Sequence, residues 1–169
     1  GAGAPNTRLT LTIPVTTEAF SGTPISVYVE QGRTETGQTT FSNPTEANIF
    51  AVSYDFFVEM GETPISEAEI VIDDSSAGLT AAVVDGIHSS FDEETSEFFG
   101  GLTVSAGEVI PAKEIISVSA SEDTTPGVYT ASLYLYYADD GGSMGYTVIP
   151  ITINVLDGIP IPKVTFNPN

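Results

Sequence analysis

The sequence predicts an all-β protein, a single-domain β-sandwich of jelly-roll or immunoglobulin-like type with about eight or nine antiparallel strands. Apolar residues alternate with polar ones along most of the chain, which is the two-residue period of a strand with one buried face. Clusters of Gly, Asp, Ser and Pro interrupt these runs at short intervals. Such interruptions are typical of proteins built from many short strands.

The first alternating run lies near the start of the chain, where Leu9, Leu11, Ile13 and Val15 are separated by Thr or Pro. This run is expected to be either the first strand of the sandwich or a strand donated to a neighbouring copy. The second alternative is open because an extended segment with one apolar face can add to an exposed sheet edge.

Further runs rich in β-branched and aromatic residues are expected to be strands. In chain order they are Pro24–Glu30, Ala47–Val58, Glu67–Ile72, Leu79–Val84, Gly101–Ser105, Ile110–Ala120, Tyr129–Tyr137 and Ile149–Val155. Turns are predicted at residues 35–37, 73–76, 126–127 and 139–142, which are rich in Gly, Asp, Ser and Pro. Residues 89–98 are the one segment expected to contain a helical turn.

The chain divides into three expected parts. Residues 1–16 form an extended segment and a candidate donor strand, residues 17–156 form the sandwich, and residues 157–169 form an extended tail. The tail contains three prolines, which are poorly suited to a central strand because proline donates no backbone hydrogen bond.

The charge balance excludes several classes of partner. The chain has 23 Asp and Glu residues against 4 Lys and Arg residues, a formal net charge of -19. Nucleic acid is not an expected partner, because phosphate binding relies on basic side chains. Membrane insertion is not expected either, because the longest apolar runs, such as Ile49–Val52, are far shorter than the roughly 20 residues of a spanning helix.

So large a charge of one sign opposes a compact fold through self-repulsion. The acidity indicates either adaptation to concentrated salt or neutralisation of the carboxylates by bound cations. Charged residues make up only 16% of the chain and its mean hydropathy is +0.13. This composition favours bound cations.

Calcium is the expected cofactor, since it takes six to eight oxygen ligands from carboxylates, backbone carbonyls and water. Acidic pairs and triplets lie in or beside predicted turns, where backbone carbonyls are exposed. The alternative for each cluster is a solvated turn. The candidate ligands are Asp73, Asp74, Asp92, Glu93, Glu94, Asp139 and Asp140.

Nothing in the sequence favours catalysis, and the protein is not expected to be an enzyme. The single histidine, His88, is followed by Ser89 and Ser90, but adjacent residues do not converge as a nucleophile, base and acid must. His88 is therefore expected in a surface loop. There is no cysteine, which excludes disulfides and thiolate chemistry.

Residues 126–137 and 146–155 form a Pro-Gly-x-Tyr turn, a long strand and a closing aliphatic strand. This pattern resembles sandwich domains of archaeal surface-layer proteins. With the acidity and the run from Leu9 to Val15, the chain also resembles subunits of archaeal extracellular filaments and tubes, namely cannula proteins and, more distantly, TasA/camelysin fibres. The resemblance implies secretion, donor-strand complementation through Leu9, Leu11, Ile13 and Val15, and calcium at subunit contacts.

The expected function is therefore a structural subunit of an extracellular homo-polymer, assembled by strand exchange and calcium-bridged carboxylates. Two alternatives stay open. One is a calcium-dependent carbohydrate-binding module or adhesin, whose stacking surface the seven tyrosines would supply. The other is a surface-layer-associated domain that binds a protein partner without assembling.

Overall fold

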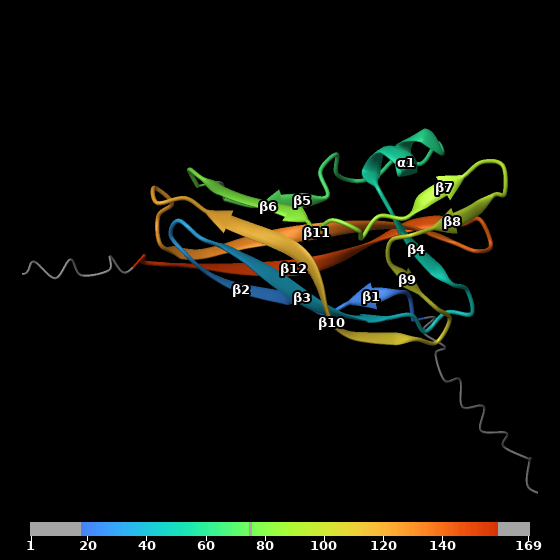
Figure 1. The fold of residues 1–169 in the computed structure, drawn as a ribbon, viewed down its shortest axis with the longest axis horizontal. Coiled ribbons are helices and arrows are strands. Elements are labelled where there is room, and N and C mark those ends of the chain that lie inside the picture. Colours follow the sequence, from blue (N-terminus) through green and yellow to red (C-terminus); the bar gives the residue numbers. More distant parts are fainter. Residues whose placement is uncertain (1–17, 75, 159–169) are drawn as a thin grey trace, which may run out of the picture.

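The structure, a computed structural model, describes residues 18–74 and 76–158. It confirms the predicted all-β sandwich: two sheets pack face to face and enclose one main core (Figure 1). The first sheet has the strand order β1 (Ser21–Gly22), β3 (Thr34–Ser42), β10 (Val109–Ala120), β6 (Leu79–Val83). The second has the order β2 (Ile25–Glu30), β12 (Met144–Leu156), β11 (Gly127–Asp139), β4 (Ile49–Val52), β9 (Thr103–Val104), with β5 (Ile70–Ile72) also paired to β11.

The core forms as the alternation predicts. Ile149, Ile151 and Ile153 of β12 are each at most 1% exposed, and they face inward beside Ala131 and Leu133 of β11. Inward residues of the opposite sheet close the core from the other side, because each strand turns alternate side chains to opposite faces.

The second sheet contains one arrangement that the sequence did not predict. β2 pairs with β12 in parallel, with Ile25 opposite Ile151 and Val29 opposite Val155. The other pairings among the described strands are antiparallel. The described part of the chain therefore starts in one sheet at β1, crosses to the other, and places β2 at an edge of that sheet beside the last described strand.

The predicted turn at residues 35–37 is wrong, because this segment lies within β3. The turn comes earlier, at Gly32, whose φ of 78° is in the left-handed region that favours glycine. Gly37 instead faces the core, and a Cβ there would lie 2.6 Å from Ile25 Cγ2 and 2.7 Å from Ile116 Cγ1. Glycine at this position permits close sheet packing.

The predicted strand from Ala47 to Val58 is correct only as far as Val52. Ser53 follows with an extended backbone, and its Oγ accepts a hydrogen bond from Phe56 N at 3.3 Å. This N-cap starts the short helix α1 (Tyr54–Glu59), as capping serines commonly do.

The helical turn expected within residues 89–98 is also wrong. These residues form a hairpin of β7 (Ser90–Asp92) and β8 (Glu97–Phe99). Asp92 Oδ1 accepts a hydrogen bond from Glu94 N at 2.9 Å and fixes the turn. Phe91 and Phe98 face the same side of this hairpin, because they pair across it.

A second apolar cluster lies on the outer face of the second sheet. Helix α1 and the β7–β8 hairpin sit over this face at one end of the elongated molecule (Figure 1). Val52, Phe57, Tyr136 and Ala138 are buried between them and the sheet. Among the described residues, no helix has the length and apolar character required to cross a membrane.

Candidate functional site

The strongest candidate site is a pocket at the end of the molecule where α1, the β7–β8 hairpin and the β11–β12 turn meet. Its floor is a group of phenylalanine rings from strand β4, helix α1 and the two strands of the β7–β8 hairpin. Phe50 of β4 stacks on Phe98 at a centroid distance of 5.0 Å, and Phe91 lies 4.9 Å from Phe98. Phe56 of α1 completes the group at 5.6 Å from Phe98.

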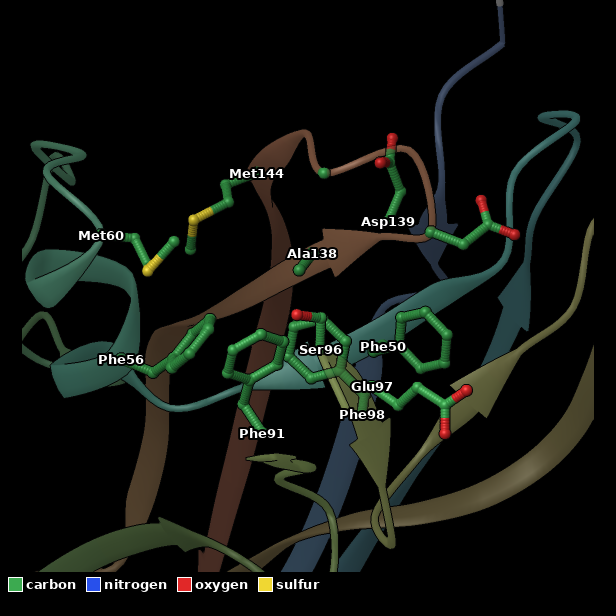
Figure 2. Close-up of a pocket in the computed structure, with 12 residues that line it drawn as sticks. Phe50, Phe56, Met60, Phe91, Ser96, Glu97, Phe98, Ala138, Asp139 and Met144 are labelled. Carbon is green, nitrogen blue, oxygen red and sulfur yellow. The ribbon is translucent and has the colours of Figure 1, made fainter. Parts of the chain in front are cut away.

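The pocket has a volume of about 560 Å³. Figure 2 shows the phenylalanine rings below the opening, with the Met60 and Met144 side chains on one side and carboxylates on the other. Methionine adapts to irregular apolar surfaces, so this wall can fit occupants of several shapes. The lining residues are Phe50, Phe56, Met60, Phe91, Ser96, Glu97, Phe98, Ala138, Asp139, Asp140, Gly142 and Met144.

The rim of the pocket is acidic. Glu97 comes from the hairpin, and Asp139 and Asp140 come from the β11–β12 turn. Burial raises the pKa of the neighbouring Tyr137, and the charge of Asp139 adds to the effect. The apolar floor and the acidic rim together suit a ligand that carries an apolar group next to a positive charge.

Several of the predicted calcium ligands already have hydrogen-bonding roles. Asp139 Oδ1 accepts from Ser143 N at 2.8 Å, and Asp92 Oδ1 accepts from Glu94 N. Asp73 Oδ2 accepts from Thr130 Oγ1 at 2.7 Å. Each bond leaves the second carboxylate oxygen free to act as an acceptor.

The structure places the predicted ligands at separate positions. Asp139 is the last residue of β11, whereas Asp73 lies beside Thr130 near the start of the same strand. Asp92, Glu93 and Glu94 are on the β7–β8 hairpin at the Asp139 end. Over residues 18–74 and 76–158, no three Asp, Glu or His side chains converge well enough to hold one metal ion. The described part of one copy therefore contains no ready-made calcium cage, and calcium binding stays a prediction.

The predicted donor residues Leu9, Leu11, Ile13 and Val15 lie outside the described residues. The described chain begins at the pocket end of the sandwich. There, Phe20 is buried in the core and its ring meets that of Tyr137 edge-on, with a centroid distance of 5.3 Å.

His88 lies in the loop between β6 and β7, as expected, and its partly exposed ring packs against Glu69, a contact that the sequence did not predict. His88 Nε2 lies 3.1 Å from Glu69 Oε2, and Glu69 Oε1 accepts from Tyr54 N at 3.1 Å. Burial by itself would raise the pKa of Glu69. The hydrogen bond and charge of His88, with the amide of Tyr54, outweigh burial, so this pKa lies below its ordinary value.

His88 and Ser89 do not form a nucleophile–base pair. His88 Nδ1 and Ser89 Oγ are both shielded from solvent, and neither has a hydrogen-bond partner within the described part of the chain. A catalytic serine must be hydrogen-bonded to its base and open to a substrate. The His88–Glu69 pair instead fastens the start of α1 to the segment before β5.

Tyr136 holds the same segment to the sheet. Its hydroxyl donates to Ser66 O at 2.6 Å, and Phe57 of α1 covers its ring at a centroid distance of 5.0 Å. Burial raises the pKa of Tyr136 to about 12, with smaller contributions from nearby groups that include Tyr54 and Glu69. Helix α1 and the segment before β5 are therefore held to the sheet by polar contacts as well as by apolar packing.

A second surface has few charges, and those near it are Glu30 at the end of β2 and Asp73 beside Thr130. On the outer face of β2, β12 and β11, Tyr28, Asn154 and Val128 form one cross-strand row. Strand β12 contains no charged residue, and β11 contains only Asp139 at its end. Tyr28, Val128 and Val148 are 65%, 68% and 44% exposed.

The sequence analysis missed the pocket, although it contained a partial signal for it. Phe91 and Phe98 stand in a strongly acidic segment, where solvent-exposed phenylalanine is unfavourable. Phe50, Phe56, Met60 and Met144 come from other parts of the chain, and only the fold brings them together.

Comparisons with known proteins support no family assignment. No protein-family model matches the chain, and no curated protein matches it in sequence.

Solved structures align with the chain at low similarity. The third ScaB cohesin of R. flavefaciens, in complex with a group 1 dockerin, is 14% identical with a TM-score of 0.42, over 87% of this chain and 100% of that one. A PapD-like domain of human CEP192 is 6% identical with a TM-score of 0.40, over 92% and 100% of the two chains. The secreted serine protease VesC of Vibrio cholerae is 14% identical with a TM-score of 0.41, over 80% of this chain.

The chain spans only 22% of the length of VesC, 31% of the VesB protease and 23% of a family 123 glycoside hydrolase. At these identities and TM-scores, the likenesses assign neither a family nor an activity.

Proposed function

We propose that this chain is a structural subunit of an extracellular polymer, in which copies join by strand pairing and calcium ions bridge carboxylates between them. The observation that carries the proposal is the uneven distribution of charge. All 23 acidic residues lie between Glu18 and Asp157. The flanking segments 1–17 and 159–169 contain no acidic residue, and each has one basic residue, Arg8 or Lys163.

Contacts between copies are favoured where this acidity is absent. The sandwich repels other sandwiches over most of its surface, because Arg33 and Lys113 are the only arginine and lysine among the described residues. The flanking segments are free of that repulsion, and the run from Leu9 to Val15 has the one-sided apolar pattern of a strand that adds to a sheet edge. Strand pairing through residues 9–15 is thus the least repulsive contact that the chain offers.

Calcium enters the proposal at the two ends of the sandwich. Asp73 and Asp74 lie beside the start of β11, and Asp139 and Asp140 lie at its end. If copies join end to end, these clusters meet, and divalent cations between them would offset the repulsion. Ligands drawn from two copies are consistent with the lack of a three-carboxylate group within the described part of one copy.

The test is electron microscopy and analytical ultracentrifugation of the purified full chain, with millimolar calcium, with EDTA, and with sodium chloride at matched ionic strength. We expect filaments or tubes with calcium and dispersed monomers with EDTA. A monomer at every calcium concentration rules out the polymer, and equal assembly in EDTA rules out the role of calcium.

The strand-exchange half is tested by Leu11→Glu, which places a charge in the apolar face of the candidate donor strand. Assembly should be lost. Thr12→Glu is the matched control, because it adds the same charge at the adjacent position on the opposite face of an extended segment. If L11E and T12E chains assemble equally well, the donor assignment is wrong.

A second candidate function is an extracellular adhesin or carbohydrate-binding module. The outer face of β2 and β12 favours it, because Tyr28 is 65% exposed there and lies opposite Asn154 of β12. Aromatic rings on a flat polar surface suit stacking against sugars. Glycan binding by a stable monomer, abolished by Tyr28→Ala, would support this function over the polymer.

A further inference from the structure

We propose that the pocket formed by α1, the β7–β8 hairpin and the β11–β12 turn receives the segment 159–169 of another copy. This inference rests on the proposed polymer and adds a specific contact to it. The contact is distinct from the candidate donor strand, which belongs to residues 1–16.

The pocket selects for an apolar group beside a positive charge. Its floor is made of phenylalanine rings and its rim of three carboxylates, from Glu97, Asp139 and Asp140. An apolar occupant would replace water against the rings, and a basic side chain would meet the rim. An acidic or purely polar segment would fit neither part.

The segment 159–169 has this chemistry. Lys163 is its single charged residue, and Phe166 follows three residues later. Its prolines restrict the unbound chain, so less conformational entropy is lost on binding, which is why proline-rich segments often dock in aromatic-lined grooves. Its apolar and proline residues are Ile159, Pro160, Ile161, Pro162, Val164, Phe166 and Pro168.

The other acid-free segment fits the pocket less well. Residues 1–17 contain Arg8 but no aromatic residue, and aromatic anchors are what well-packed pockets most often bind. Their apolar residues alternate over seven positions, a pattern that suits a sheet edge better than a compact pocket.

The geometry requires two copies. The pocket lies beside the start of β12, and the described chain continues past the far end of that strand (Figure 1). Strand β12 has 13 residues, so its ends are about 40 Å apart at roughly 3.3 Å per residue. Eleven further residues span at most about 40 Å when fully extended, which leaves no length to turn back and enter the pocket of the same copy.

A contact between opposite ends of two copies joins different surfaces on each partner. Such a contact does not close on itself unless the rotation between copies forms a ring, and otherwise it continues as an open filament. The pocket contact therefore makes the proposed polymer polar, with all copies oriented head to tail and the long axis of each sandwich parallel to the polymer axis.

The central test is a charge exchange in the full chain. Glu97 is exposed and its carboxylate accepts no hydrogen bond among the described residues, so Glu97→Lys should leave the fold intact. E97K alone and Lys163→Glu alone should each weaken association by about tenfold, because each places like charges together. Mixing the two variants should restore association, since every pocket can then find a tail of opposite charge.

The readouts are sedimentation velocity and electron microscopy in calcium, with circular dichroism to verify folding. Restored assembly in the mixture supports the proposal. The proposal is overturned if both single variants assemble as well as the unmodified chain. It is also overturned if the mixture associates as weakly as each variant alone.

A second test examines the apolar half of the contact without altering charge. Phe166→Ala should weaken association on the order of 30-fold, as the loss of a buried aromatic anchor does. Met60→Ala in the pocket wall should also weaken it. Phe99→Ala is the matched control, because Phe99 is 59% exposed beside the pocket but does not line it. An effect of F99A equal to that of M60A would contradict the assignment.

A final measurement separates failure of this inference from failure of the polymer. A fluorescent peptide of residues 159–169 is titrated with the full chain and with E97K, and a peptide of residues 1–17 serves as competitor. Peptide binding that E97K weakens supports the pocket even if the chain never polymerises. If F166A and E97K chains polymerise like the unmodified chain and the peptide does not bind, the pocket contact is wrong but the proposed polymer stands. Preferential pocket binding of peptide 1–17 also overturns the inference.

Discussion

At the scale of single residues, Asn43 shows how one buried polar side chain organises the loops near the pocket. It is 1% exposed, and its Nδ2 donates to Ala47 O at 2.8 Å and to Val104 O at 2.9 Å. Its Oδ1 accepts from Thr45 N and Oγ1 at 3.1 and 2.6 Å. The side chain thus ties the loop before β4 to strand β9.

Asn43→Asp should lower the free energy of unfolding by about 3 kcal/mol, because it removes both donors and places a negative charge against backbone carbonyls. Asn48→Asp is the matched control. Asn48 Oδ1 accepts from Ala106 N at 3.0 Å, and a carboxylate can do the same while adding equal charge. Urea denaturation measures both variants, and equal losses would contradict the role given to Asn43.

The Glu69–His88 pair gives a prediction for the dependence of stability on pH. The pKa of Glu69 is lower in the folded state than in the unfolded chain, so its contribution to stability is present above the unfolded pKa. That contribution is lost as the pH falls through the folded pKa. Glu69→Gln should therefore cost about 1–2 kcal/mol near pH 7 and progressively less below about pH 4.5.

Glu67→Gln is the control for this experiment, because Glu67 is exposed and its removal relieves the same amount of general repulsion. Chemical denaturation between pH 7 and pH 3 should show a gap between the two variants that closes on acidification. A gap independent of pH would show that the lowered pKa is not the source of the effect.

At the scale of elements, β3 depends on the absence of a side chain at Gly37. Gly37→Ala should lower the free energy of unfolding by about 1–3 kcal/mol, since its Cβ would be forced against Ile25 and Ile116. Gln38→Ala, one residue later and exposed, should have an effect below about 0.5 kcal/mol. Thermal denaturation compares the two, and equal midpoints would contradict the packing argument.

Elements with strong alternation could be predicted from the sequence, and those without it could not. Strands β11 and β12 were expected at residues 129–137 and 149–155. Strand β11 extends two residues further on both sides, and β12 starts five residues earlier and ends one residue later. Strand β3 was missed because its residues are mostly polar, and its buried positions near the centre are Gly37 and Thr39. Its strand character comes from pairing with β10, a long-range contact that local pattern does not contain.

Part of the candidate site could likewise be predicted from the sequence, and part could not. Acidic residues at the β11–β12 turn and in residues 92–94 were singled out from the sequence, and the structure brings both to the pocket end of the molecule. The aromatic floor was not anticipated. Phe50 and Phe56 lie far in sequence from Phe91 and Phe98, and the floor that they form together depends on Ser53, which ends a strand and starts a helix.

At the scale of the whole molecule, the dominant feature is charge. Raising sodium chloride from 10 to 500 mM should increase the melting temperature by roughly 2–8 °C, because screening weakens self-repulsion. The increase should level off once the Debye length falls to a few ångströms. A rise that continues through several molar salt would favour adaptation to brine, the alternative to bound cations.

Calcium at matched ionic strength should raise the melting temperature beyond the effect of sodium, because a ligand of the folded state stabilises it by mass action. Magnesium is the control, since it is smaller and keeps its water more strongly. Identical curves for calcium, magnesium and sodium would contradict specific calcium binding and leave screening as the sole effect.

The parallel pairing of β2 with β12 has a consequence for how the chain acquires its structure. Strand β2 is hydrogen-bonded to a segment more than a hundred residues further along, so the second sheet stays incomplete in a nascent chain until residue 156 has emerged. A topology with such high contact order folds slowly, roughly in milliseconds to seconds. During synthesis the chain therefore reaches residue 156 with its largest sheet still incomplete, and the edge strand β2 can pair only after β12 is available.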